Sequence, residues 1–170
     1  GVYPILYAFY DKSGQLDDGL MRLQVDKCIA TGAHGIAVLG LVTEVHKLDT
    51  QERRHLVQVV GKAINARVPY AVTIGEQSVH GQTEFARMAM GEGASWVILQ
   101  PPSIKGFAEA EYVRFLGAVA DAVDIPVAEC PSRIPLPSEE VESNRSWIDG
   151  LSRDLSHAWI DTSLITIKAI

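Results

Sequence analysis

The sequence predicts an α/β fold with parallel strands, a partial (β/α)8 TIM barrel of about the first four to five βα units. Near-continuous apolar runs, typical of parallel strands buried on both faces, alternate with longer amphipathic stretches. The runs recur at about 30 residues, the spacing of βαβ units. Four runs are complete, at 5–9, 35–40, 69–74 and 96–100, and a fifth at 125–128 is cut short by Glu129-Cys130-Pro131.

The first helix is predicted to begin at Asp17 or Asp18, because a carboxylate there accepts hydrogen bonds from the free amides of the first turn. It is predicted to end at Thr31-Gly32, where glycine favours a helix terminus. Helical spacing of its apolar residues predicts one broad buried face. That face includes Leu20, Leu23, Val25 and Ile29.

The later helices are bounded by equally clear signals. Residues 49–52, Asp-Thr-Gln-Glu, form a capping-box pattern that starts the second helix. The third helix is predicted to begin after Ser78 and to end at 91–93, and the fourth to run from about Ala108 to Val123. The residues of the fourth helix that we expect to face inward are Tyr112, Phe115, Leu116 and Val119.

Two architectures share this alternation, a closed barrel and an open doubly wound sheet. The turn at 10–14 lacks Gly-x-Gly-x-x-Gly, and the sequence contains no Walker-type Gly-Lys-Ser/Thr. These absences argue against an open sheet that binds nucleotides. In a barrel, the chemistry lies in the loops that follow the strands. Here those points are predicted at 9–10, 40–44, 75–78 and 100–102.

Composition and charge exclude several classes of function. A net charge of −6 and the lack of a basic cluster give no electrostatic basis for binding nucleic acid. No apolar run approaches the roughly 20 residues that span a membrane, so we expect no membrane partner and a cytoplasmic protein. Two cysteines are too few for a disulfide scaffold, and Cys28 is expected to be a buried free thiol. The histidines lack zinc-binding spacing, so no metal is expected.

Seven motifs, taken in order, resemble one enzyme family. They lie at 4–17, 32–40, 44–53, 68–69, 92–94, 101–102 and 122–127. Their residues and spacing are similar to those of the dihydrodipicolinate synthase and N-acetylneuraminate lyase group of class I aldolases. Each motif alone is weak, but seven in register over residues 2–128 make an accidental match very improbable.

The resemblance implies aldol cleavage or condensation with pyruvate or a related 2-keto acid as the small-molecule partner, and it implies no cofactor. In that family a lysine on the sixth strand forms a Schiff base with the keto acid. A tyrosine on the fifth strand moves protons with a hydroxyl of a Gly-Thr-Thr-Gly-Glu loop, which also binds the substrate carboxylate. That loop matches 40–44 here. The implied substrate-binding residues are therefore Gly40, Leu41, Val42 and Thr43.

This chain departs from the family pattern at working positions. Val42 occupies the place of the relay threonine, and Thr43 stands where the family has glycine. Thr43 is the candidate to supply the hydroxyl from the next position. Where the family often shows Pro-Pro-Tyr-Tyr, the chain has Pro-Pro-Ser-Ile at 101–104. These changes are consistent with a divergent subgroup that uses another acyl substrate.

The segment 130–170, which we call the tail, departs further from the family than the predicted barrel segment 1–129. Lys168 follows the apolar run 164–167, as a sixth-strand lysine does, and is the candidate Schiff-base residue. It also lies further from Pro126 than the family spacing, which fits an ordinary lysine. One back-translation of 131–141, read two nucleotides out of phase, gives Ile-Gln-Asn-Pro-Pro-Ala-Phe, like the loop of divergent family members. A frameshift near Glu129 is one hypothesis for the tail, and a remnant segment is another.

Two functions of other classes remain open. One is a catalytically inactive remnant or regulatory subunit that binds a small carboxylate, or nothing, through the loop at Gly40. The other is an open-sheet binding module unrelated to aldolases. In either case a partial barrel keeps open sheet edges and apolar faces that favour association. We therefore expect a homo-oligomer.

Overall fold

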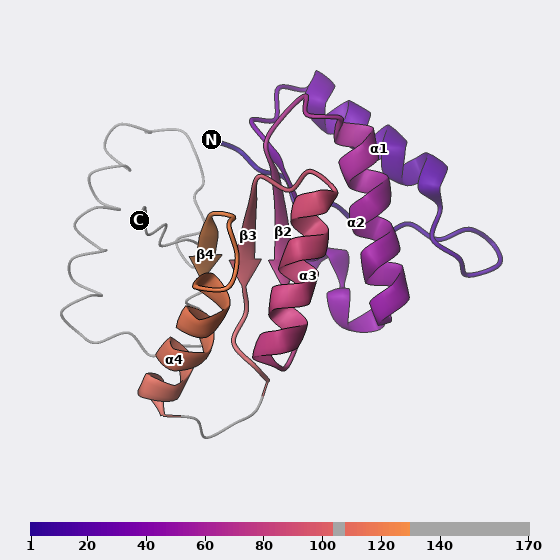
Figure 1. Ribbon diagram of the computed structural model, residues 1–170. Coiled ribbons are helices and arrows are strands. Elements are labelled where there is room, and N and C mark those ends of the chain that lie inside the picture. The colour runs from indigo at the N-terminus through magenta and orange to yellow at the C-terminus, as the bar shows by residue number, and fades with distance from the viewer. Residues whose placement is uncertain (104–107, 130–170) are drawn as a thin grey trace, which may run out of the picture.

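A computed structural model describes residues 1–103 and 108–129, in which four parallel strands form one sheet. The strands are β1 (Ile36–Val38), β2 (Tyr70–Ile74), β3 (Trp96–Leu99) and β4 (Val127–Glu129). Their order in the sheet is the same as their order in the chain, and all three pairings are parallel. Figure 1 shows the sheet with helices packed in front of it. The predicted parallel α/β fold is confirmed.

The first predicted strand forms only an isolated pairing. Ile5 makes a parallel bridge with Ala37, and the Leu6 amide donates to the Ala37 carbonyl at 2.9 Å. Beyond Leu6, the backbone of Tyr7 forms hydrogen bonds with the side chain of Gln24 and not with β1. Its amide donates to Oε1 of Gln24 at 3.0 Å, and its carbonyl accepts from Nε2 at 3.1 Å. The first run thus lies beside β1 in the place of a strand, but Gln24 interrupts the ladder.

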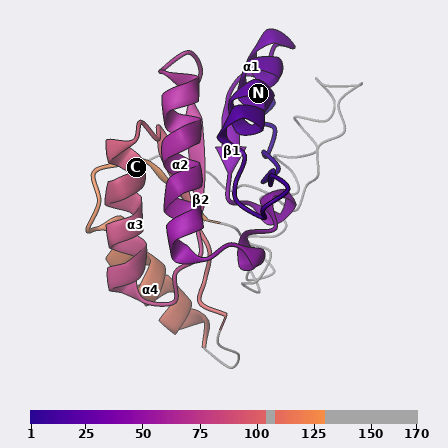
Figure 2. The ribbon, with the colours of Figure 1, turned by 90° about the vertical axis from the view of Figure 1, so that its right-hand side faces the viewer.

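Four α-helices connect and cover the strands. They are α1 (Asp18–Ala30), α2 (Thr50–Ile64), α3 (Val79–Gly91) and α4 (Glu109–Ala120). Helices α2 and α3 lie on the same face of the sheet, with α1 packed against α2 and α4 against α3 (Figure 2). Two short 3₁₀ helices, η1 (Leu41–Thr43) and η2 (Val45–Lys47), lie between β1 and α2. None of the helices in these described ranges is long and apolar enough to cross a membrane.

The predicted helix starts are confirmed by their capping hydrogen bonds. Asp17 caps α1 by accepting from the Leu20 amide at 2.9 Å. In α2, Asp49 and Glu52 form a complete capping box, with each side chain accepting from the other residue's amide at 2.8 Å. Ser78 caps α3. Satisfying these free amides fixes where each strand-to-helix connection ends.

The broad apolar face predicted for the first helix is wrong. Helix α1 buries Met21 and Val25, whereas Leu20 and Leu23 are 43% and 50% exposed. Helical periodicity predicts which residues share a face, but not whether another element packs there. The described partner of α1 is α2, and it covers only one side. Cys28, on the same helix, is a free, half-buried thiol, and burial raises its pKa.

The core lies between the helices and the two strands β1 and β2. All residues of these two strands are buried. Tyr70 is fully buried at the start of β2, its hydroxyl donates to the Val57 carbonyl at 3.3 Å, and burial raises its pKa well above the ordinary value. Phe85 of α3 packs into the same core, with the guanidinium of Arg54 on α2 5.6 Å from its ring centre. Helices α2 and α3 are therefore fixed to each other as well as to the sheet.

Gly61 allows α2 to approach the end of α3 closely, and we expect Gly61→Ala to destabilise the fold. A β-carbon there would overlap the main-chain oxygen of Glu92, which cannot move like a side chain. Overpacking typically costs about 1–3 kcal/mol, more than the roughly 1 kcal/mol that alanine contributes through helix propensity. Chemical denaturation should show a lower free energy of unfolding for this variant.

Gly117→Ala is the matched control. A β-carbon on Gly117 in α4 meets no atom within 4 Å, so only the gain in helix propensity remains. This variant should be equal to or more stable than the parent chain. A Gly61→Ala protein that is as stable as Gly117→Ala would show that α2 and α3 are not closely packed at this point.

Candidate functional site

The candidate site lies at the edge of the sheet where β1, β2 and β3 end. Parallel strands point the same way, so the loops that follow them gather at one edge. Here these loops are residues 39–49, 75–78 and 100–103. The first of them contains all four predicted substrate-binding residues.

The loop after β1 contains two residues in the left-handed backbone region. Leu39 has φ of 63° and Glu44 has φ of 54°, and neither is glycine. Such a conformation costs about 1–2 kcal/mol for an L-residue. Leu39 is buried in the core, and Glu44 is the residue at which η1 ends and η2 begins. Backbone strain of this kind concentrates at functional sites and ligand clamps.

The predicted substrate-binding residues point in different directions within this loop. Gly40 is buried against Ile5, whose side chain would lie 3.1 Å from an added β-carbon. Leu41 is 76% exposed and Val42 is partly exposed. Thr43 is only 2% exposed, and its hydroxyl donates to the Leu6 carbonyl at 2.7 Å. The loop therefore presents apolar side chains outward and its hydroxyl inward.

The hydrogen bond from Thr43 to Leu6 limits what the Thr43 hydroxyl can do. A hydroxyl has one proton to donate and two lone pairs that accept. The proton of Thr43 is used by the carbonyl of Leu6, which leaves the oxygen as an acceptor. Val42, at the position of the relay threonine, has no hydroxyl. The other candidate catalytic residue, Lys168, lies outside the residues that the structure describes.

Tyr10, at the first of the predicted strand ends, stands near this loop. Tyr10 follows the first apolar run, and burial and then the carboxylates of Glu52 and Glu44 raise its pKa above the ordinary value. The phenol of a tyrosine is protonated at neutral pH even without this shift, so Tyr10 can donate a hydrogen bond. Its signal in the sequence is its place at a strand end, but residue type alone does not distinguish it from a surface tyrosine.

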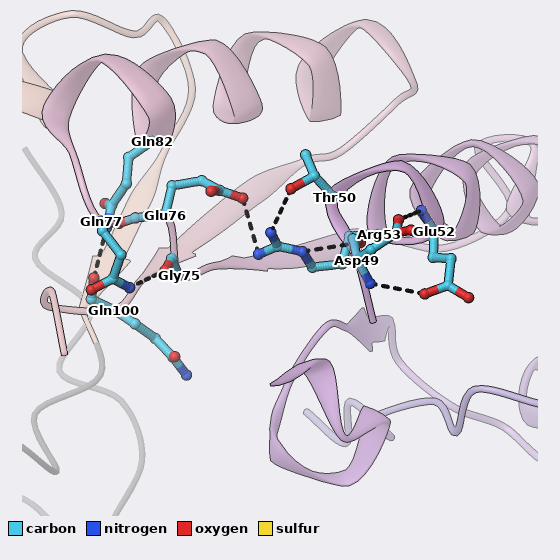
Figure 3. Close-up of polar contacts among 9 residues, drawn as sticks. All are labelled: Asp49, Thr50, Glu52, Arg53, Gly75, Glu76, Gln77, Gln82 and Gln100. Atoms are coloured by element: carbon cyan, nitrogen blue, oxygen red, sulfur yellow. Dashed lines mark hydrogen bonds and ion pairs between the residues drawn. The ribbon is translucent and has the colours of Figure 1, made fainter. Parts of the chain in front are cut away.

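An ion pair joins the loop after β2 to the start of α2 (Figure 3). Nη1 of Arg53 lies 3.0 Å from Oε1 of Glu76, and the two side chains are mostly buried. The guanidinium also donates to the Asp49 carbonyl at 3.3 Å and to the Thr50 hydroxyl at 3.0 Å. Arg53 thereby connects Glu76 to the capping box that ends the loop after β1.

Two glutamines join the loop after β2 to the loop after β3. Gln82 of α3 is completely buried, and its Nε2 donates to the main-chain oxygens of Glu76 at 2.8 Å and Gln100 at 2.7 Å. Gln77 donates to the Gly75 carbonyl at 2.8 Å and accepts from the Ser103 amide at 2.7 Å. In Figure 3 the side chain of Gln100 points away from this network.

The amide of Gln82 contributes little net stability. Its two hydrogen bonds stabilise by about 1 kcal/mol each, whereas a buried acceptor without a partner costs about 1–3 kcal/mol. Oε1 of Gln82 is such an acceptor, since no described residue donates to it. The two effects are of similar size. The amide therefore fixes the positions of two loops more than it adds to the free energy of folding.

Gln82 could have been suspected from the sequence. It shares the buried face of α3 with Phe85, Ala86 and Ala89 at helical spacing, and a polar residue on such a face needs partners. Which carbonyls it reaches depends on the tertiary fold and has no local signal. Within 1–103 and 108–129, no group of three histidine, cysteine, aspartate or glutamate side chains is placed to hold a metal ion.

Comparisons with known proteins agree with this architecture. A family model described as the dihydrodipicolinate synthetase family matches residues 1–133. The chain is 33% identical over 115 residues to a 4-hydroxy-tetrahydrodipicolinate synthase of Pelobacter propionicus, covering 68% of this chain and 40% of that protein. It is 27% identical over 130 residues to an L-2-keto-3-deoxyarabonate dehydratase of Azospirillum brasilense, covering 75% of this chain and 42% of that protein.

A solved structure from the same family has a similar fold. The crystal structure of YagE from Escherichia coli K12, described as belonging to the dihydrodipicolinic acid synthase family and in complex with pyruvate, superposes with a TM-score of 0.72 at 26% identity. The match covers 79% of this chain and 46% of that one. The chain thus spans less than half the length of these relatives. The family match over residues 1–133, on a parallel sheet with these strand-end loops, shows that the chain belongs to the dihydrodipicolinate synthetase family.

Proposed function

We propose that this chain belongs to an aldolase-type lyase that acts on pyruvate or a related 2-keto acid through a lysine Schiff base. The observation that carries the proposal is the strained loop after β1, which lies at the carboxyl edge of the sheet, within the residues 1–133 that the family model matches, and which resembles the family's substrate loop in sequence. A family member that superposes on this fold was crystallised with pyruvate. Backbone amides of Gly40, Leu41 and Val42 are the proposed contacts for the keto acid's carboxylate, because the Thr43 amide donates to the Gly40 carbonyl at 3.1 Å.

Lys168 is the proposed Schiff-base lysine. The lysine must be deprotonated to attack the keto carbon, so a functional Lys168 needs a depressed pKa, as burial provides. Attack by its nitrogen on the C2 carbonyl of a 2-keto acid and loss of water give an iminium. When a base takes the proton of the C4 hydroxyl, the C3–C4 bond breaks, an aldehyde leaves, and the iminium accepts the electron pair to become an enamine. Thr43 is the proposed hydroxyl of the loop, acting through the oxygen lone pairs that its bond to Leu6 leaves available.

A second candidate function is binding of a small carboxylate without turnover. It is favoured by the absence of a hydroxyl at Val42 and by the engagement of the Thr43 proton with Leu6. Both features weaken proton transfer while leaving the backbone of the loop in place. This alternative keeps the same ligand class and the same loop as the first proposal, and differs only in the chemical step.

We also propose that the chain forms homo-oligomers in the cytoplasm. Leu20 and Leu23 of α1 are exposed on the same face as Gln24, whose side chain holds the exposed Tyr7. In a closed barrel the first and last helices are neighbours, so this apolar surface is one that a further helix covers. The free thiol of Cys28 fits a reducing compartment.

Borohydride trapping tests the Schiff base. When the full chain is incubated with pyruvate and sodium borohydride, we expect a covalent adduct whose mass maps to Lys168, because reduction makes the iminium permanent. Lys168→Ala should abolish the adduct, and Lys105→Ala is the control. Peptide mass spectrometry provides the measurement. Pyruvate binding without any adduct would support the second candidate function, and an adduct at another lysine would contradict the assignment of Lys168.

Turnover tests the role of the loop hydroxyl. We expect little retro-aldol activity from the parent chain, and more from Val42→Thr, because the variant supplies a hydroxyl at the relay position. Acid–base assistance is worth about 10²–10⁴-fold, so the increase should be large. Pyruvate release from 2-keto-3-deoxy acids is the assay, with Val42→Ala as the control. Robust activity in the parent chain, unchanged in Val42→Thr, would contradict this expectation.

Light scattering after size-exclusion chromatography tests the assembly. At low micromolar concentration the parent chain should be larger than its monomer mass of 18.5 kDa. Leu23→Lys should shift it toward the monomer, because a charge there disfavours burial of the apolar face. Val113→Lys, which alters another exposed apolar residue on α4, is the control. A parent chain that elutes as a sharp monomer would overturn the proposal.

A further inference from the structure

We propose that Gln82 is a positioning residue that holds the loops after β2 and β3 in the geometry needed to bind the 2-keto acid. The inference rests on the proposed function, because it concerns the same edge of the sheet. Gln82 lies on α3, outside the predicted substrate loop, and no family motif in the sequence includes it. Its action is through the main chain of Glu76 and Gln100 and not through contact with the ligand.

The hydrogen bonds between β2 and β3 end at the Gln100 amide, and Gln82 makes the next connection between the two chains. The last link between the strands is the Gln100 amide, which donates to the Ile74 carbonyl at 2.9 Å. Beyond it, the chains after β2 and β3 diverge into their loops. Nε2 of Gln82 bridges the carbonyls of Glu76 and Gln100 and so continues the connection past the end of the ladder. Gln77 adds a further tie, to the Ser103 amide.

The same contact also reaches the loop after β1. Fixing the main chain of Glu76 fixes where its carboxylate lies, and that carboxylate pairs with Arg53. Arg53 in turn donates to the carbonyl of Asp49, the residue that ends the loop containing Gly40. The amide of Gln82 is thereby linked to all three loops of the candidate site. Figure 3 shows the contacts that lead from Gln82 through Glu76 and Arg53 to Asp49.

The chemistry of this amide distinguishes positioning from stability. An apolar residue of the same length removes the unpaired Oε1, but it also leaves the carbonyls of Glu76 and Gln100 without their donor, so we expect the loops to move until water reaches those carbonyls. Gln82→Met keeps the length of the side chain and removes both donors. The loops would then lose their bridge while the core of α3 remains filled.

The experiment compares pyruvate affinity with thermal stability in the full chain. By isothermal titration calorimetry, Gln82→Met should bind pyruvate about tenfold more weakly, which corresponds to 1.4 kcal/mol, with a smaller fall in melting temperature than Phe85→Leu shows. Phe85→Leu, on the same buried face of α3, is the matched control, and it should lower the melting temperature without changing affinity. Gln82→Met with parental affinity would overturn the inference.

Gln82→Glu provides a second, independent variant. An ionised carboxylate cannot donate and repels the carbonyls of Glu76 and Gln100, whereas a protonated one donates a single hydrogen bond. Pyruvate affinity of this variant should therefore recover in part as the pH falls, while that of the parent chain does not change in the same way. Equal pH dependence in both proteins would count against a positioning role.

Hydrogen exchange separates failure of this inference from failure of the proposed function. If the parent chain binds no pyruvate, the proposed ligand is wrong, and the role of Gln82 is judged from the loops alone. Gln82→Met should then raise amide exchange in residues 75–78 and 100–103 and leave α2 unchanged. Unchanged exchange in both loops would overturn the positioning role, whatever the ligand.

Discussion

Strand β2 cannot satisfy its backbone alone, and this requirement organises the described part of the chain. Every one of its residues, Tyr70–Ile74, is buried, and buried amides and carbonyls must be hydrogen bonded. Parallel partners on both sides, β1 and β3, meet that need. Parallel neighbours in turn require crossover helices, which return the chain to the same end of the sheet each time. The location of the candidate site is thus a consequence of hydrogen bonding at the centre of the sheet.

At the carboxyl edge the regular ladder ends, and the loops are held by two different means. The loop after β1 is held by the burial of Leu39 and by hydrogen bonds of its own backbone, such as that from the Glu44 amide to the Leu41 carbonyl. The loops after β2 and β3 are held by side chains, through Gln82 and the ion pair of Arg53 with Glu76. Both means shape the edge before any ligand arrives, and preorganisation of this kind lowers the entropic cost of binding.

Features set by neighbouring residues were predictable from the sequence, and features set by distant ones were not. The caps at Asp17 and Asp49 depend on a few adjacent residues, and the apolar runs predicted the parallel sheet. The extent of the first strand was not predictable, because Gln24 competes for its backbone from another element. The partners of Gln82 lie on two separate loops, and the conformation of Leu39, a non-glycine residue, has no sequence signature.

The order of the strands has a consequence for how the sheet can form during synthesis of the chain. Each strand of the sheet pairs with the strand that precedes it in the chain, so the sheet can be extended in the direction of synthesis. Both partners of the β1–β2 pairing are synthesised before β4, although a domain generally folds as a unit. Because no strand is inserted between two earlier ones, the architecture grows by addition at one edge.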